Sequence, residues 1–195
     1  DVLLTSFRPS ALPRLGLAWA DLHARHPRLH QVAIVGAPGA RAEEAGHDLT
    51  YQADSGLVTG LDLPPTLCAD MGGALEAVRA ILLAALSGAA GRPGQYTEVA
   101  LSEAASFLAL PRRWAITREG DILGGAHPGY RVYACADGRV ALAALEPHFA
   151  RTTCEAVGIA ELEPQALAAF FREKSRAELD RLAQEKDIPL HTLAA

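Results

Sequence analysis

The stretch ADMGGALEAVRAILLAAL, residues 69–86, decides the fold of the first part of the chain. Its large apolar residues Leu75, Val78, Leu82 and Leu86 recur every three or four positions, which is the spacing of one helix face. The longest largely apolar run, residues 80–90, is too short for a membrane span, which needs about 20 residues. The pattern therefore predicts a long buried helix over residues 70–86 and no membrane span.

Three short apolar segments around this helix predict β-strands. They are DVLLTS at residues 1–6, HQVAIVG at residues 30–36 and QYTEVA at residues 95–100. Short apolar runs that contain β-branched residues and end at proline or glycine are typical of strands. Helical spacing lies between them, over residues 10–24 with a division at Gly16 and over residues 48–53, while residues 37–46 and 56–65 predict loops. Alternating strands and helices predict an α/β domain.

The second part of the chain has a different pattern. Residues 101–116 are helical in spacing, with an interruption near Pro111. The stretch YRVYACADGRVALAAL, residues 130–145, predicts an antiparallel hairpin closed by a turn at Asp137-Gly138. Helical segments follow, with a break over residues 158–164 and a short strand at residues 188–190. We therefore expect an α/β domain over residues 1–118 and a smaller α+β domain over residues 119–195.

Composition limits the function classes. Half of the 195 residues are hydrophobic and 21% are charged, as in ordinary folded domains. The net charge of −5 argues against a nucleic-acid binder, which needs a basic surface to neutralise phosphates. The three cysteines, Cys68, Cys135 and Cys154, form no CxxC pair, so we expect no disulfide framework, no zinc site and a reducing cytoplasm.

Metal and nucleotide motifs are also missing from the sequence. His23, His26 and His30 are close in sequence, but Pro27 breaks the helix that would align them and no carboxylate or cysteine joins them. Neither GxxxxGK[ST] nor GxGxxG occurs. We therefore predict no bound metal.

Two clusters contain candidate acid–base groups. In the first, His47 and Asp48 follow Gly46 in a loop before a short helix, where the pair can act as a base; alternatively, Asp48 caps the helix and His47 is exposed. In the second, Asp70 stands at the predicted start of the long helix, before Gly72 and Gly73. Bare amides there can hold developing negative charge beside a carboxylate; alternatively, Asp70 is only an N-cap.

Three further groups have both a structural and a functional interpretation. Glu146 precedes Pro147 at a predicted helix start, so it is either a capping acid or a carboxylate at the mouth of a site. Gly124 and Gly125 lie in a glycine-rich loop that is either a connector or a lid. The arginines near the first strand form either a solvated face or a binding surface for ligand phosphates. They are Arg8, Arg14, Arg25 and Arg28.

Several of these segments together resemble a known family. They are DVLLTSFRPSALPRLGL, AGHDLTYQADSGL, ADMGGALEAVRAILLAAL, LGGAHPGYRVYACADGRVALAALEPHFA and KDIPLHTL, in this order. The set resembles the class III CoA-transferase (CaiB/BaiF) family over essentially the whole chain, and most closely its branch that racemises α-methylacyl-CoA thioesters. The resemblance implies a partial Rossmann-like large domain followed by the small α+β domain. Family members are longer at both ends, so the chain looks truncated.

The resemblance also implies roles for particular residues. In the transferase branch, the aspartate that matches Asp70 attacks the thioester and carries the acyl group as a mixed anhydride. In the racemase branch, this aspartate and the histidine that matches His47 exchange the α-proton, and Asp48 and Glu146 match a supporting acidic pair. Arg14 matches an arginine that holds CoA phosphates. On the same grounds we place Gly72, Gly73, Gly124 and Gly125 on the substrate side of the site.

The expected function follows from this resemblance. A racemase needs two bases whereas a transferase needs only the aspartate, so the presence of His47 favours racemisation of a 2-methylacyl-CoA thioester. The alternatives are CoA transfer between carboxylic acids and, in a different class, an inactive remnant of the family. The implied substrate is an acyl-CoA, with no further cofactor, and the full-length protein is expected to be an interlocked cytoplasmic homodimer.

Overall fold

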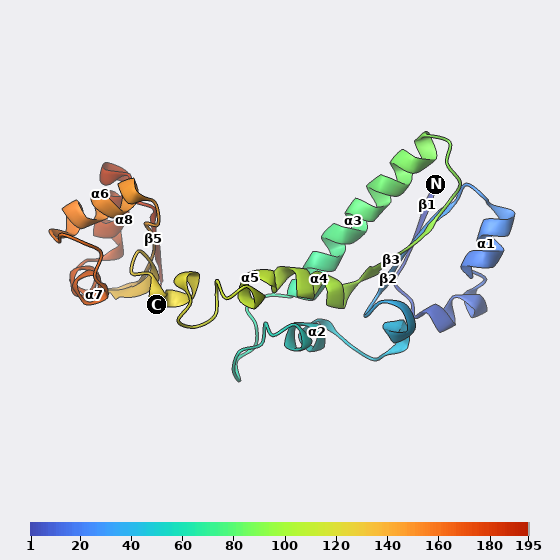
Figure 1. Ribbon diagram of the computed structural model, residues 1–195, viewed down its shortest axis with the longest axis horizontal. Coiled ribbons are helices and arrows are strands. Elements are labelled where there is room, and N and C mark those ends of the chain that lie inside the picture. The colour runs from blue at the N-terminus through green and yellow to red at the C-terminus, as the bar shows by residue number, and fades with distance from the viewer. Residues whose placement is uncertain (195) are drawn as a thin grey trace. The chain divides into compact units, whose positions relative to one another are not determined.

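The computed structural model describes residues 1–194. The chain divides into two compact units, Asp1–Leu110 and Pro111–Ala195, and each is described here by itself (Figure 1). The domain boundary expected after residue 118 lies within the second of these units.

The first unit contains a parallel three-stranded sheet. Its strands are β1 (Val2–Thr5), β2 (His30–Val35) and β3 (Tyr96–Ala100), in the order β1-β2-β3. Leu4 lies opposite Val32 on β2, and Val32 lies opposite Thr97 on β3. The three strand predictions and the α/β class of this unit are thus confirmed. All three strands run in one direction, so their carboxyl ends meet at one edge of the sheet.

Helical segments lie between the strands, and one more follows β3. Those between the strands are the short turns η1 (Pro9–Ala11), η2 (Pro13–Leu15) and η3 (Gly39–Glu43) and the helices α1 (Trp19–Arg25), α2 (Asp48–Asp54) and α3 (Cys68–Ala89). Helix α4 (Leu101–Leu108) follows β3 directly. Two predictions need correction. The segment over residues 10–24 forms two 3₁₀ turns before α1, because Pro9 and Pro13 each start a new turn and Gly16 ends the second with φ of +70°. The predicted loop over residues 37–46 contains η3.

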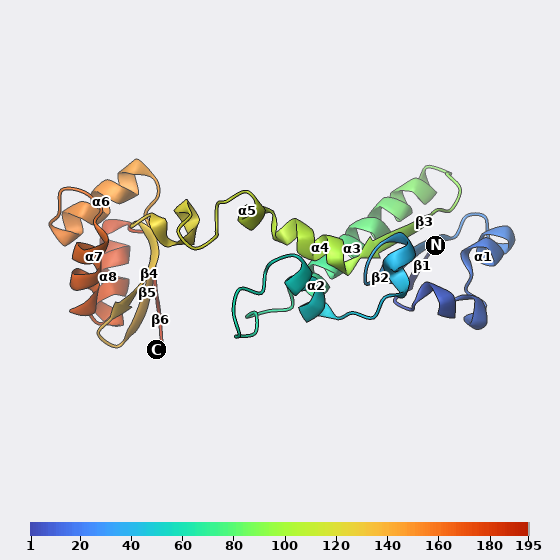
Figure 2. The ribbon, with the colours of Figure 1, turned by 60° about the horizontal axis from the view of Figure 1, so that its bottom comes forward.

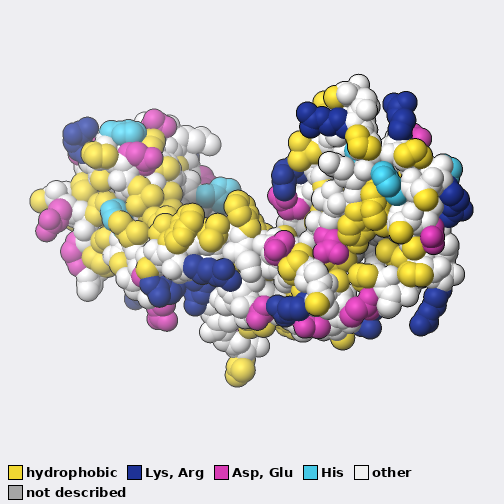
Figure 3. Space-filling view, turned by 45° about the vertical axis from the view of Figure 1, so that its right-hand side comes forward, with side chains coloured by type: hydrophobic (Ala, Val, Ile, Leu, Met, Phe, Trp, Pro, Cys, Tyr) yellow, Lys and Arg dark blue, Asp and Glu magenta, His cyan; other side chains and the backbone are white. Residues whose placement is uncertain are grey.

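The long helix α3 buries the face that the sequence pattern did not favour. The residues turned inward are small, whereas Leu75, Val78, Leu82 and Leu86 are 70%, 55%, 60% and 69% exposed. The buried set is Ala69, Gly73, Ala77, Ala80 and Ala84. Small side chains let the helix backbone lie close to the sheet, where Val32 and Val99 pack against it. The helix prediction is confirmed, but the leucine face is not buried. Hydrophobic side chains reach the surface of the first unit in Figure 3.

The two faces of the sheet are covered differently (Figure 2). α3 packs on the face that carries Val32 and Val99. The other face carries Tyr96, whose ring lies 6.0 Å from the Trp19 ring of α1.

Cys68–Ala89 is the one helix within residues 1–194 that is long and apolar enough to cross a membrane by length and composition. Core helices pass the same test, so this is weak evidence for a membrane span.

The second unit is an antiparallel α+β fold, as predicted. Its sheet has the order β4-β5-β6, formed by β4 (Tyr130–Cys135), β5 (Gly138–Ala143) and β6 (Leu190–Leu193). The helical segments are α5 (Leu110–Arg113), η4 (Ile122–Ala126), α6 (Pro147–Val157), α7 (Pro164–Arg172) and α8 (Arg176–Lys186). The buried core between sheet and helices includes Val140, Leu142, Leu167, Phe171 and Leu179.

The hairpin turn lies one residue earlier than predicted. Cys135 pairs with Gly138, so the turn residues are Ala136 and Asp137. Contacts from outside the hairpin account for this register, because the Ala136 N–H donates to the Lys174 carbonyl and the Asp137 carboxylate accepts the Arg176 N–H. A side chain at Gly138 would collide with the Leu193 carbonyl of β6, which explains the glycine.

The packing of α3 makes a testable prediction about stability. Leu82→Ala should change the free energy of unfolding by about 0.5 kcal/mol or less, because the side chain is already in water. Val32→Ala should cost about 2 kcal/mol, because that side chain is fully buried. Urea denaturation followed by circular dichroism measures both values. Equal losses would show that the leucine face is covered in solution.

Candidate active site

A small cavity lies where the strands of the first unit end. Its volume is about 110 Å³, and it is lined by residues 6–8, which follow β1, by residues 34–36 at the end of β2, and by Glu44, Gly46 and Tyr51. In parallel sheets, ligands bind outside the carboxyl ends of the strands. The position of this cavity therefore marks it as the candidate site.

The predicted pair His47 and Asp48 lies at the start of α2, between Gly46 and Tyr51 in the sequence, and these two residues line the cavity. His47 precedes the helix, and its backbone N–H donates to the Thr50 hydroxyl at 3.0 Å, which in turn donates to the His47 carbonyl at 2.8 Å. These bonds fix the backbone of His47 and leave its imidazole exposed. The local geometry thus holds a solvent-accessible base next to the wall formed by Gly46.

The carboxyl group of Asp48 does not face solvent. Asp48 is 6% exposed. Its Oδ1 accepts the backbone N–H of Asp70 at 3.0 Å. Oδ2 accepts an N–H of the Gln52 amide at 2.5 Å. The first turn of any helix leaves amides without partners inside the helix, and Leu67 offers α3 no side-chain cap. Asp48 therefore caps α3 from a different helix, and it brings two of the predicted residues together.

Asp70 is the third residue of α3 and its side chain is exposed. Its position in the first turn places the carboxylate at the positive end of the helix dipole, which stabilises negative charge. Because the Met71 N–H already donates to the Leu67 carbonyl at 2.9 Å, the amides free of helical partners precede Met71. Asp70 thus combines an accessible carboxylate with a backbone that Asp48 holds in place.

Gly72 and Gly73 have a different environment from the one expected. α3 begins at Cys68, two residues before the predicted start, so both glycines lie within the helix rather than among its free amides. A side-chain carbon at Gly72 would lie 3.2 Å from Leu108 and 3.3 Å from Ala104, and one at Gly73 would collide with Leu101. Close packing of α4 against α3 accounts for both glycines. At this position the two glycine amides lie beyond the first turn of α3, which is where free N–H groups could face a substrate.

Tyr51 is a site residue that the sequence reasoning did not identify. Its phenol lies over Gly36 and Gly46, and a side-chain carbon at either glycine would collide with the ring or hydroxyl. Burial raises the pKa of Tyr51; Asp70 and Glu44 raise it further, and Arg8 opposes them. The Asp70 carboxylate is thus one of the groups that raise the pKa of the phenol. One sequence feature could have indicated Tyr51 as a site residue. It lies three residues after Asp48, on the same helix face, and its helix stands between two glycine-containing loops.

The remaining predicted residues lie elsewhere. Arg14 is exposed on η2, whereas Arg8 lines the cavity. Glu146 belongs to the second unit, where it is exposed directly before Pro147, the first residue of α6. Gly124 and Gly125 also belong to the second unit. A side chain at Gly124 would collide with the Arg118 carbonyl, and Gly125 has φ of +103°, so the loop backbone requires both glycines.

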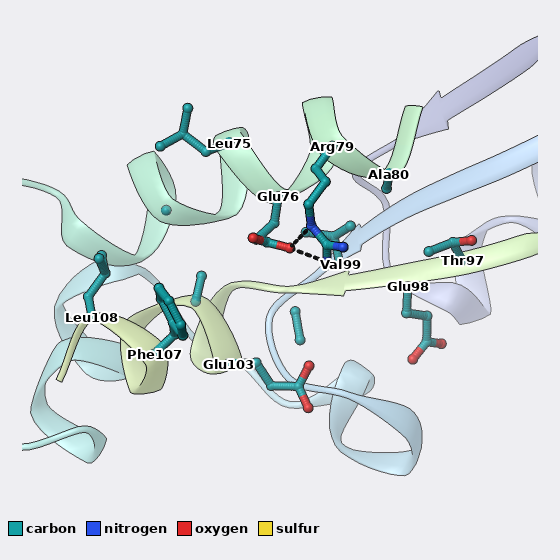
Figure 4. Close-up of a pocket in the computed structure, with 13 residues that line it drawn as sticks. Leu75, Glu76, Arg79, Ala80, Thr97, Glu98, Val99, Glu103, Phe107 and Leu108 are labelled. Atoms are coloured by element: carbon teal, nitrogen blue, oxygen red, sulfur yellow. Dashed lines mark hydrogen bonds and ion pairs between the residues drawn. The ribbon is translucent and has the colours of Figure 1, made fainter. Parts of the chain in front are cut away.

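A larger cavity of about 440 Å³ lies along α3, β3 and α4 (Figure 4). Leu75, Val99, Phe107 and Leu108 give it apolar walls, and the ion pair of Glu76 and Arg79 stands at its side. Asp48 and Asp70 line neither of these two cavities. The larger cavity also has charged lining residues, namely Glu76, Arg79, Glu98 and Glu103. The choice of the smaller cavity therefore depends on its place at the carboxyl ends of the strands.

The three cysteines are free thiols. Within residues 1–194, no group of three or more His, Cys, Asp and Glu side chains is placed to hold a metal ion.

Comparison with known proteins assigns the family. The family model described as CoA-transferase family III matches residues 1–194. The chain belongs to CoA-transferase family III. The family resemblance seen in the sequence is thereby confirmed, and with it the class of fold.

Relatives within CoA-transferase family III have more than one activity. Human alpha-methylacyl-CoA racemase is 29% identical over 209 residues, covering 91% of this chain and 55% of its own length. Succinyl-CoA--D-citramalate CoA-transferase of Chloroflexus aurantiacus is 32% identical over 206 residues, covering 93% of this chain and 50% of its own length. The chain thus spans about half the length of these curated relatives, and neither activity transfers to it directly.

Solved structures support the fold of this CoA-transferase family III chain. The crystal structure of the hypothetical protein Rv3272 from Mycobacterium tuberculosis superposes with a TM-score of 0.83 at 21% identity, covering 100% of this chain and 61% of that chain. A CaiB/BaiF family protein from Brucella suis gives a TM-score of 0.76 at 23% identity, covering 100% and 60%.

The cap that Asp48 provides can be tested by substitution. Asp48→Ala should lower the free energy of unfolding by about 1–3 kcal/mol, because the Asp70 N–H loses its acceptor in a buried setting. Asp54→Ala is the matched control, since Asp54 is exposed at the end of the same helix. Urea denaturation measures both, and similar values for the two variants would contradict the cap.

The raised pKa of Tyr51 predicts a loss of stability at alkaline pH. The phenol ionises more easily in the unfolded chain, near pH 10, than in the folded one. The stability that the neutral phenol contributes is therefore present below that pH and lost as the pH rises through the raised pKa. Tyr51→Phe should lose less stability than the unchanged protein between neutral pH and about pH 11. Parallel losses in urea denaturation would refute this.

Proposed function

We propose that this chain carries the acid–base centre of an enzyme that racemises 2-methylacyl-CoA thioesters at the α-carbon. The observation that supports the proposal is the bond from the Asp70 N–H to Asp48, the residue next to His47. This bond ties the segment that carries His47 directly to the segment that carries Asp70. Since the chain spans about half of its relatives' length, the activity of the whole protein is also part of the proposal.

The chemistry requires one base on each side of the α-carbon. One of the pair, His47 or Asp70, removes the α-proton, and the electron pair moves to the thioester oxygen as an enolate. The other then donates a proton to the opposite face, which inverts the centre. Positioned general acids and bases contribute about 10²–10⁴-fold to such proton transfers. The exposed imidazole and the exposed carboxylate at the dipole-stabilised helix end have the chemical character that these steps need.

CoA transfer between carboxylic acids is the second candidate function. The Asp70 carboxylate would attack the thioester carbonyl carbon, and the carbon–sulfur bond would break. The products of this step would be the free CoA thiolate and an aspartyl–acyl anhydride. The relative at 32% identity that is named a CoA-transferase favours this alternative. An exposed carboxylate suffices for that reaction, so His47 distinguishes the two. The third candidate is an inactive remnant of the family, in which His47 and Asp70 are present but catalyse no reaction.

The setting of the enzyme is proposed on the family resemblance. We propose that the substrate is an acyl-CoA, without another cofactor, and that the protein, if full length, forms an interlocked homodimer in the cytoplasm. Arg14 is proposed to hold CoA phosphates. Glu146, Gly124 and Gly125 of the second unit, like Gly72 and Gly73, keep their implied roles only as predictions.

The test is proton exchange at the α-carbon. The purified chain is incubated with a 2-methylacyl-CoA in D₂O, and loss of the α-proton signal is followed by NMR. Asp70→Ala and His47→Ala should each slow the exchange by about 100-fold or more for the epimer whose α-proton faces the missing base. His26→Ala, at an exposed histidine that follows α1, should leave it unchanged.

Transfer of CoA to a free carboxylate is measured on the same samples. His47→Ala should retain transfer if both activities exist, and Asp70→Ala should lose it. Exchange of both epimers at the unchanged rate in His47→Ala contradicts the two-base mechanism. Transfer without any exchange would support the second candidate function, and the absence of both would support the remnant.

A further inference from the structure

We propose that Gln52 is a positioning residue that holds the start of α3, and with it Asp70, in place. The proposal deepens the proposed function and rests on it in one respect, namely that Asp70 is the reacting carboxylate. The argument for the position itself uses only contacts within the first unit. Gln52 would touch neither substrate nor product.

The Gln52 amide joins two segments that approach α3. Its Nε2 donates one N–H to Asp48 Oδ2 at 2.5 Å and the other to the Thr66 carbonyl at 2.9 Å. Both protons of the amide are thus used. Asp48 in turn accepts the Asp70 N–H, so two consecutive hydrogen bonds connect the Gln52 amide to the backbone of Asp70.

The same residue also holds both ends of the connection between α2 and α3. The Leu57 N–H donates to the Gln52 backbone carbonyl at 2.9 Å, near the point where the chain leaves α2. The side chain of Gln52 binds Thr66, two residues before α3 begins at Cys68. Several side chains of the intervening segment, including Leu61 and Leu63, are exposed. Gln52 therefore supplies an internal tie for a segment that gains little from burial.

The orientation of the amide is set by its two acceptors. Gln52 is 1% exposed, and its Oε1 is buried without a hydrogen-bond partner among the described residues. Rotating the amide would turn this oxygen toward the Asp48 carboxylate and the Thr66 carbonyl, where oxygen would face oxygen. The observed rotamer thus leaves its own oxygen unpaired and serves Asp48 and Thr66.

This arrangement accounts for how a buried carboxylate stays aligned with the helix end. A carboxylate bound only through Oδ1 can rotate about its side-chain bonds, and the Asp70 N–H would then lose its acceptor. With Oδ2 held by Gln52, Oδ1 is fixed toward Asp70. The reacting carboxylate of Asp70 gains a fixed backbone while its own side chain stays free for substrate. Active sites depend on such support, because small displacements of reacting groups lower rates strongly.

Three variants test the proposal. Gln52→Met keeps the side-chain length and removes both donors. Gln52→Glu keeps the shape but sets a carboxylate against Asp48, so it should be the more harmful change. Gln31→Met is the matched control, because Gln31 is also fully buried in the first unit but its amide donates to the Leu17 carbonyl at 3.5 Å, not to Asp48.

The first readout is hydrogen exchange of the Asp70 amide, followed by NMR on the ¹⁵N-labelled chain. It requires no enzymatic activity. Gln52→Met should speed this exchange about tenfold, and Gln52→Glu more, while Gln31→Met leaves it within about twofold. Unchanged exchange in Gln52→Met, or equal acceleration in Gln31→Met, would overturn the proposal.

The second readout is α-proton exchange of a 2-methylacyl-CoA in D₂O. Gln52→Met should lower kcat about tenfold and change KM less than twofold, because the acyl-CoA does not touch Gln52. A fall in kcat that Gln31→Met reproduces would reveal a general loss of structure and reject the positioning role. If the unchanged chain shows no α-proton exchange, the proposed function fails, and the Asp70 amide still decides whether Gln52 holds the start of α3.

Discussion

The site of the first unit depends on one hydrogen bond, from the backbone N–H of Asp70 to the carboxylate of Asp48. Helix α3 has no cap of its own, so the carboxylate on α2 completes its first turn. The bond joins α2 to α3 and fixes the backbone of the exposed Asp70 at the start of α3. His47 is the residue before Asp48, so the same bond ties its segment to Asp70. The Asp48 carboxyl group therefore serves both the start of α3 and the position of Asp70.

Much of this organisation could be predicted from the sequence. The strands at residues 1–6, 30–36 and 95–100 follow from short apolar runs that proline and glycine end, and the structure places strands there. The alternation of strands and helices was enough for an α/β class. Asp48 and Asp70 stand out in the sequence because each lies near glycine at a predicted helix start, where an acid is either a cap or a reacting carboxylate. That they bind each other could not be read from the sequence, since 21 residues separate them and the link is formed by folding.

The features that could not be predicted depend on tertiary contacts. Periodicity shows that residues 70–86 form a helix, but it cannot show that the alanine face packs on the sheet while the leucines face outward. The sequence predicts a turn at Asp137-Gly138, but hydrogen bonds to the Lys174 carbonyl and from the Arg176 N–H hold the turn at Ala136 and Asp137. Tyr51 was missed because an aromatic residue on a short helix is usually core, and only the folded chain shows it against two glycine backbones.

The packing of Tyr51 against Gly36 and Gly46 also constrains how this site can change during evolution. A side chain at either glycine is blocked while the phenol is present, so a smaller residue must replace Tyr51 before either glycine can be replaced. The three positions therefore set the shape of the cavity together, and the residue at position 51 decides what the other two can hold.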